Sequence, residues 1–102
     1  MVIDPSWEPE RVYNIAREEG IVIKYIVNTH CHEDHVNGNR TMKELSGAVI
    51  AIHEAETKYL RHFFPPGADM KLNEGDTLNL GKVSAVVIHT PGHSPGGVCL
   101  YE

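Results

Sequence analysis

Stretches of consecutive apolar residues divide the sequence and predict its β-strands. The runs 21–27 and 48–52 are apolar with little polar alternation, which is typical of strands covered on both faces. A shorter apolar piece at 2–4 is closed by a proline and predicts the end of another strand. Leucines and turn residues over 70–88 predict hairpin strands, and the last strand is expected at 98–101.

Between these strands, apolar residues recur at the spacing of an α-helix. We expect a first helix with Ser6 as its N-cap and Gly20 as its C-terminal glycine. A weaker amphipathic pattern predicts a second helix that ends at Gly47, and a third helix is expected over 54–64. The sequence Pro65-Pro66-Gly67 is expected to stop this third helix.

Length and composition restrict what this chain can be. Its 102 residues, 41% of them hydrophobic, are typical of one globular domain, so we treat 1–102 as a single domain. Strand–helix alternation followed by hairpins predicts an α/β fold. No apolar run approaches the ~18 residues of a membrane span, so we expect no membrane partner. Nine basic against 14 acidic residues, without a basic cluster, argue against a nucleic-acid partner.

Seven histidines are the unusual feature of the composition, and four potential metal ligands lie within six positions directly after the run 21–27. These ligands are His30, His32, Asp34 and His35. If the strand persists that far, His30 and His32 face the same side because side chains alternate along a strand. Imidazole and carboxylate groups bind zinc and similar ions. We predict a metal site, because a purely structural cluster would bury several polar groups that each need a partner.

A second motif, Thr90–Gly97, holds one more histidine among prolines and glycines. These residues fix an irregular loop, which is a costly way to hold His93 unless its direction matters. A catalytic zinc site has three protein ligands and one open position, and His30, His32 and His93 would supply the three.

Two other catalytic patterns are rejected on physical grounds. Residues 92–96 fit the G-x-S-x-G pattern of a serine hydrolase, but Pro95 has no N–H for an oxyanion hole, and no helix is expected to follow. Residues 32–35 are not the H-E-x-x-H motif of a zinc peptidase, because their histidines are three positions apart instead of four.

The remaining cysteines and histidines are expected to have structural roles. Cys31 should point away from the metal and into the core, and Cys99 is also expected in the core. His53 is expected to cap a helix, and His62 is expected to lie on a helix surface. For His89, the alternative to a structural role is a place beside the substrate or beside a metal ligand. Two cysteines are too few for a disulfide scaffold, so the reducing cytoplasm is the expected location.

Together, the two motifs resemble those of the metallo-β-lactamase superfamily, and the resemblance covers essentially the whole chain. The matching strings are His30-x-His32-x-Asp34-His35 and Pro91-Gly92-His93-Ser94-Pro95-Gly96, supported by Val2-Ile3-Asp4-Pro5 before the first helix. The fuller strings 28–39 and 89–97 resemble most closely the glyoxalase II-like hydrolase branch of that family.

This resemblance implies the N-terminal half of an αβ/βα sandwich, with one mixed sheet and helices on one face. It implies that His30, His32 and His93 bind a first zinc ion. Asp34 and His35 match ligands of a second ion, with Asp34 also the catalytic residue near the attacking water. The family mechanism is hydrolysis by a metal-bound hydroxide, and the implied substrate is a small-molecule ester or thioester.

Two alternatives to a zinc hydrolase stay open. Relatives with a similar motif hold iron and carry out redox chemistry, so iron or manganese could replace zinc. In the family, a bridging aspartate and another histidine follow the second motif, and no residues here match them. A zinc-binding structural half-domain with little turnover is therefore the second alternative.

Half of a sandwich would also leave apolar strand surface uncovered. The apolar faces of 21–27 and 83–88 would then be only partly covered. We therefore expect a symmetric homodimer that buries this sheet face.

Overall fold

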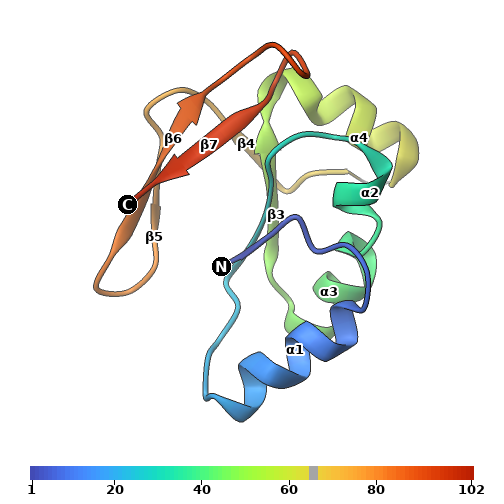
Figure 1. Cartoon of the computed structure of the whole chain (residues 1–102), viewed down its shortest axis with the longest axis vertical. Helices are drawn as coiled ribbons and strands as arrows, with labels where there is room; N and C mark the ends of the chain where they lie inside the picture. The colour runs from blue at the N-terminus through green and yellow to red at the C-terminus, as the bar shows by residue number, and fades with distance from the viewer. Residues whose placement is uncertain (65–66) are drawn as a thin grey trace.

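The chain folds into two stacked β-sheets with helices on one side of the stack, as the computed structural model shows for residues 1–64 and 67–102 (Figure 1). The parallel sheet has the strand order β1-β2-β3-β4, with β1 (Val2–Ile3), β2 (Tyr25–Asn28), β3 (Val49–His53) and β4 (Met70–Leu72). The antiparallel sheet has the order β5-β6-β7, with β5 (Thr77–Asn79), β6 (Ser84–His89) and β7 (Val98–Tyr101). The predicted α/β class is confirmed.

The division into two sheets differs from the one mixed sheet that the resemblance implies. Strand β4 pairs in parallel with β3, so the hairpin predicted over 70–88 begins only at β5. A tight turn at 73–76, with Gly75 at a φ of 83°, leads the chain from one sheet to the other. Stacking is favoured because it buries apolar side chains of both sheets against each other, among them Val27 and Val87.

The helices cover the face of the parallel sheet that is turned away from the antiparallel sheet (Figure 1). They are α1 (Pro9–Glu18), α2 (Glu33–Val36), α3 (Asn39–Ser46), the 3₁₀ helix η1 (Glu54–Glu56) and α4 (Thr57–Phe63). On this face, Ile26 and Ile52 pack in one cluster with Met42 and Leu60, and each is at most 1% exposed. Since Val27 packs on the opposite face, strand β2 is covered on both faces, as predicted.

Helix α1 begins differently from the prediction. Ser6 is not its N-cap, because the helix starts at Pro9 and Glu8 occupies the cap position with a φ of 57°. The Ser6 hydroxyl instead donates a hydrogen bond of 2.6 Å to the main-chain oxygen of Asp34. Ser6 therefore ties the start of α1 to helix α2, and the cap prediction was wrong because this partner is distant in sequence.

Strand β2 is shorter than the apolar run 21–27 predicts. It begins at Tyr25, and Ile21 and Val22 are 57% and 76% exposed. The Ile21 N–H donates to the Ala16 oxygen at 2.8 Å, after Gly20 has turned the chain at a φ of 71°. Ile21 completes the end of α1 before the chain enters the sheet, so the apolar run predicted too long a strand.

The other predicted helix ends lie close to the observed ones. Helix α3 ends before Gly47, which has a φ of 70°, and the third predicted helix appears as η1 followed by α4. Its predicted stop at Pro65-Pro66 lies outside the described residues.

Among the helices that the structure describes, none is long and apolar enough to cross a membrane. The cytoplasmic location stays a prediction.

The carboxyl ends of the parallel strands meet at one edge of their sheet. The register pairs Ile3 with Val27 and Asn28 with Ile52, so the segments after β1, β2 and β3 emerge side by side. The loop between β6 and β7 reaches the same edge, where the Val98 N–H donates to the Thr29 oxygen at 3.0 Å. Ligands in parallel-strand proteins bind at this kind of edge.

The outer face of the antiparallel sheet carries exposed apolar side chains. Val86, Ile88 and Tyr101 are 37%, 38% and 67% exposed, and Val86 lies directly opposite Tyr101 across β6 and β7. The inner faces that we expected to be uncovered instead pack against each other within one chain. The homodimer stays a prediction, and this outer face is the surface it would use.

Candidate metal centre

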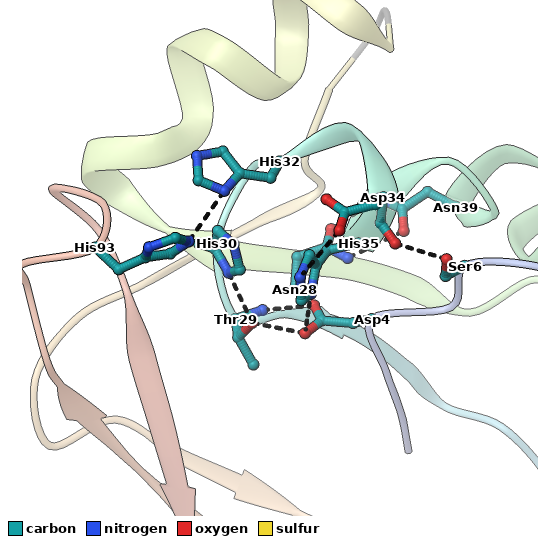
Figure 2. A network of polar contacts seen from close by, with 10 residues as sticks. All are labelled: Asp4, Ser6, Asn28, Thr29, His30, His32, Asp34, His35, Asn39 and His93. Atoms are coloured by element: carbon teal, nitrogen blue, oxygen red, sulfur yellow. Dashed lines mark hydrogen bonds and ion pairs between the residues drawn. The ribbon is translucent and has the colours of Figure 1, made fainter.

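Three histidines from two distant segments converge at the carboxyl edge of the parallel sheet. His30 and His32 follow strand β2, and His93 comes from the loop between β6 and β7 (Figure 2). One ring nitrogen from each residue lies within 4.8 Å of those of the other two. The His93 Nε2 and His32 Nδ1 atoms are 3.2 Å apart. Two nitrogens bound tetrahedrally to zinc would lie roughly 3.3 Å apart, so this triad fits a metal ion.

The ring of His30 has one buried nitrogen without a hydrogen-bond partner among the described residues. His30 is only 8% exposed, and its Nε2 atom has no hydrogen-bond partner among the residues that the structure describes. The other ring nitrogen, Nδ1, lies 3.0 Å from the Thr29 hydroxyl. A buried nitrogen without a partner costs free energy, and a metal ion in the triad would satisfy it.

A carboxylate that directly follows the neighbouring strand β1 favours one tautomer of two imidazoles. Asp4 accepts hydrogen bonds from the Thr29 N–H at 2.8 Å, from the Thr29 hydroxyl at 2.6 Å and from His35 Nδ1 at 3.0 Å (Figure 2). Because the Thr29 hydroxyl hydrogen points to Asp4, its oxygen accepts from His30 Nδ1–H. In the neutral rings, Nε2 is then the nitrogen without a proton in both His30 and His35, and it can bind a metal.

Burial also keeps the His30 ring neutral. Desolvation lowers the pKa of His30 below its ordinary value of 6.5, and the nearby rings of His35 and His32 lower it further. Only the neutral imidazole is a metal ligand, so the environment of His30 prepares it for metal binding near neutral pH.

Asp34 and His35 form a second pair beside the triad and are not part of it. Asp34 lies in the exposed first turn of α2, with 71% of its side chain exposed, and its Oδ2 is 3.8 Å from His35 Nε2. The ring of His35 packs against that of His30, with centroids 4.2 Å apart. The structure thus places every predicted site residue at one edge of the sheet, and the ligand roles themselves stay predictions.

The loop that carries His93 is tightly folded. The Thr90 N–H donates to the Gly97 oxygen at 2.8 Å, and the Gly92 N–H donates to the Ser94 oxygen at 3.1 Å. A Cβ atom at Gly97 would lie 2.9 Å from the Thr90 oxygen, so only glycine fits there. Ser94 is 7% exposed and is followed by strand β7, not by a helix, which agrees with rejecting a serine nucleophile.

The remaining cysteines and histidines mostly occupy the places predicted for them. Cys31 is buried, and burial together with the nearby Glu56 carboxylate raises the pKa of its thiol to about 11. His62 is exposed on α4, and His53 Nδ1 accepts from the Ala55 N–H at 3.0 Å as a helix cap.

Cys99 was wrongly expected in the core. It is exposed, because the alternation along β7 buries Val98 and turns Cys99 outward. His89 does not join the triad but stacks on His53, with ring centroids 4.0 Å apart and planes 13° from parallel.

The sequence patterns did not identify Asp4 or Glu56. Asp4 is the last residue of the expected strand piece 2–4, and its site role follows only once that strand is placed beside β2. Glu56 is 2% exposed and contacts the His93 loop, and no sequence pattern around it indicated this contact. For Asp4, the signal available in the sequence was an acidic residue at the end of an expected strand. The sequence offered no comparable signal for Glu56.

Comparison with curated proteins identifies relatives of greater length. The hydroxyacylglutathione hydrolase of Maricaulis maris is 40% identical over 90 residues, which cover 88% of this chain and 33% of that protein. The hydroxyacylglutathione hydrolase of Pelagibacter ubique is 35% identical over 100 residues, covering 98% of this chain and 39% of that protein. An uncharacterized protein of Aquifex aeolicus is 32% identical and is covered over 53% of its length. The chain therefore spans between a third and about half of these relatives.

Solved structures and a family profile agree with these matches. The B3 metallo-β-lactamase BLEG-1 superposes with a TM-score of 0.84 at 26% identity, covering 97% of this chain and 54% of that one. The subclass B3 enzyme BJP-1 of Bradyrhizobium japonicum gives a TM-score of 0.79 at 28% identity, covering 94% and 43%. The profile of the metallo-beta-lactamase superfamily matches residues 1–102. This chain belongs to the metallo-β-lactamase superfamily.

Proposed function

We propose that this chain provides the zinc-binding part of a hydrolase that acts on a small ester or thioester. The observation that carries the proposal is the convergence of His30, His32 and His93, with the buried His30 Nε2 atom left without a partner among the described residues. The relatives named hydroxyacylglutathione hydrolase support hydrolysis of an acyl compound. An all-imidazole set favours zinc over manganese, which prefers oxygen ligands.

His30, His32 and His93 would hold the zinc ion, which would lower the pKa of a bound water molecule to about 7 and polarise a carbonyl group. The chain's own residues supply the rest. His30 and His32 come from one segment and His93 from another, so the folded loop is needed to complete the set. Burial of His30 excludes water from one side of the site.

Asp34 is the residue we assign to proton transfer. Its carboxylate is largely exposed and lies beside His35, whose ring packs against His30. A carboxylate in this place can accept a proton from an attacking water and keep that water oriented. Asp4 in turn holds His35 through its Nδ1 atom.

The same two residues are the candidates for a second ion. Asp34 Oδ2 and His35 Nε2 are 3.8 Å apart and offer two donor atoms. We expect a second ion to bind more weakly than the first, because the triad offers three donors and one of them is buried.

Metal binding and turnover together test this proposal. The metal-free chain is titrated with zinc, and hydrolysis of an activated aryl ester and of a thioester is followed with and without the ion. We expect one tightly bound zinc and metal-dependent hydrolysis, both lost in His93→Ala. The matched control is His62→Ala, since His62 is an exposed histidine on α4, and it should change neither property.

Two results would contradict a zinc hydrolase, and each would favour one of the alternatives. Zinc bound tightly with hydrolysis no faster than that of free zinc would favour a structural half-domain. Iron found in protein purified without added metal would favour the redox alternative.

A further inference from the structure

The loop of His93 is held from one side by the segment that follows strand β3. The Gly96 N–H donates to Glu56 Oε1 at 3.0 Å. His89, the last residue of β6 before the loop, stacks on His53, the last residue of β3, and donates from Nε2 to the Pro95 oxygen at 3.0 Å. Helix η1 therefore contacts the loop directly through Glu56, and the end of β3 contacts it through His89, both at places separate from the histidine triad.

Glu56 is the unusual member of this contact. It is a charged side chain that is only 2% exposed, and burying a carboxylate costs several kcal/mol unless hydrogen bonds compensate for the lost water. An exposed acid would serve a helix terminus equally well. The burial of Glu56 therefore points to a role that depends on its contact with Gly96.

The contact between Glu56 and the loop is closely fitted. A Cβ atom on Gly96 would lie 2.5 Å from Glu56 Cγ and 3.2 Å from the Glu56 nitrogen. Gly96 is three residues from His93, and the hydrogen bonds within the loop link its two ends. A displacement at Gly96 is thus transmitted to His93, because the loop has little freedom to absorb it.

We propose that Glu56 is a positioning residue of the metal centre, which anchors Gly96 and thereby holds His93 against His32 and His30. This inference rests on the proposed metal site. Glu56 itself does not touch the triad; it acts through the backbone of the loop. Groups that hydrogen-bond directly to a metal ligand typically change metal affinity by about 10- to 100-fold when they are removed, so for Glu56, which acts through the loop backbone, we expect the lower end of that range.

A purely structural role would have a different signature. It would lower the stability of the metal-free chain and leave the zinc affinity of the folded fraction unchanged. A positioning role lowers zinc affinity even where the metal-free variant is folded. It also changes the visible absorption bands of bound Co²⁺, since these bands report the number and geometry of its ligands.

The experiment measures zinc affinity in the chain 1–102 by competition with a chromophoric chelator. We expect Glu56→Ala to weaken zinc binding by about tenfold or more and to alter the Co²⁺ spectrum. Glu56→Gln should stay within about threefold of the wild type, because its amide oxygen still accepts from Gly96. The matched control is Glu54→Ala, an exposed acid of the same helical turn, which should bind zinc as the wild type does.

A second variant tests the contact from the loop side. Gly96→Ala keeps Glu56 but forces the loop away from it, so it should also weaken zinc binding by about tenfold. Should Glu56→Ala not fold, Gly96→Ala and Glu56→Gln decide the question. Folded Glu56→Ala or Gly96→Ala that binds zinc within threefold of the wild type, with an unchanged Co²⁺ spectrum, overturns this inference alone. A wild-type chain that binds no zinc overturns the proposed function as well.

Discussion

The substitution Asp4→Asn tests whether one carboxylate organises the edge of the sheet. Asp4 accepts from the Thr29 N–H, the Thr29 hydroxyl and His35 Nδ1, and only 16% of its side chain is exposed. Asparagine keeps the shape and also tolerates the positive φ of 46° at this position. The substitution therefore removes the charge and one acceptor without adding backbone strain.

The expected loss can be worked out from these contacts. The amide oxygen still accepts from the Thr29 N–H, and the Thr29 hydroxyl can reverse to accept from the amide. The hydrogen bond that the carboxylate accepts from His35 Nδ1–H is lost, because a ring N–H and an amide NH₂ are both donors. His35 can contact the amide only in its other tautomer, without the charge. A hydrogen bond to a charged group contributes about 1.5–3 kcal/mol, so the free energy of unfolding should fall by about 2 kcal/mol.

Urea unfolding of the metal-free protein measures this loss. With a urea dependence of about 1–3 kcal/mol/M for small proteins, the midpoint should shift by roughly 1 M. The matched control is Glu33→Gln, an exposed acid of α2, which should change stability by less than about 0.5 kcal/mol. If Asp4→Asn also stays within 0.5 kcal/mol, the three contacts do not stabilise the fold and the reasoning is refuted.

Three further predictions follow from single features of the structure. Desolvation and the nearby His89 lower the pKa of His53 below 6.5, so the unfolded chain binds a proton at this residue more strongly than the folded chain does. The free energy of unfolding of the metal-free protein should therefore fall as the pH drops from 7.5 to 5.5. This fall should be less steep in His53→Asn. Gly38→Ala places a Cβ 2.6 Å from two main-chain oxygens and should cost about 2 kcal/mol in thermal or urea unfolding. Sedimentation velocity should show a dimer that Val86→Lys dissociates; a wild-type monomer of 11.4 kDa at micromolar concentration would contradict it.

The sequence was informative wherever a feature depended on neighbouring residues. Four potential ligands packed directly after an apolar run indicated that His30 and His32 share a site, although β2 ends at Asn28 and strand alternation does not reach them, and the proline- and glycine-rich loop singled out His93. Helix ends at Gly20 and Gly47 followed from local backbone preference. These features need only a few consecutive residues, and for that reason they were predictable.

Features that depend on distant pairing could not be predicted in the same way. The role of Asp4 requires that β1 lie beside β2, and the role of Glu56 requires that the His93 loop fold back onto η1. The apolar run 21–27 did not reveal that Ile21 completes a helix end. The separation into two sheets depended on which apolar faces could bury each other, and this is decided by the whole chain.

X-ray absorption at the zinc edge, on the chain loaded with one equivalent of zinc, shows whether the three histidines share one ion. We expect one ion per chain with three imidazole nitrogens at about 2.0–2.1 Å, and fewer imidazoles in His93→Ala. A zinc ion surrounded by oxygen alone, or an imidazole count that His93→Ala leaves unchanged, would contradict the claim that these three histidines share one metal.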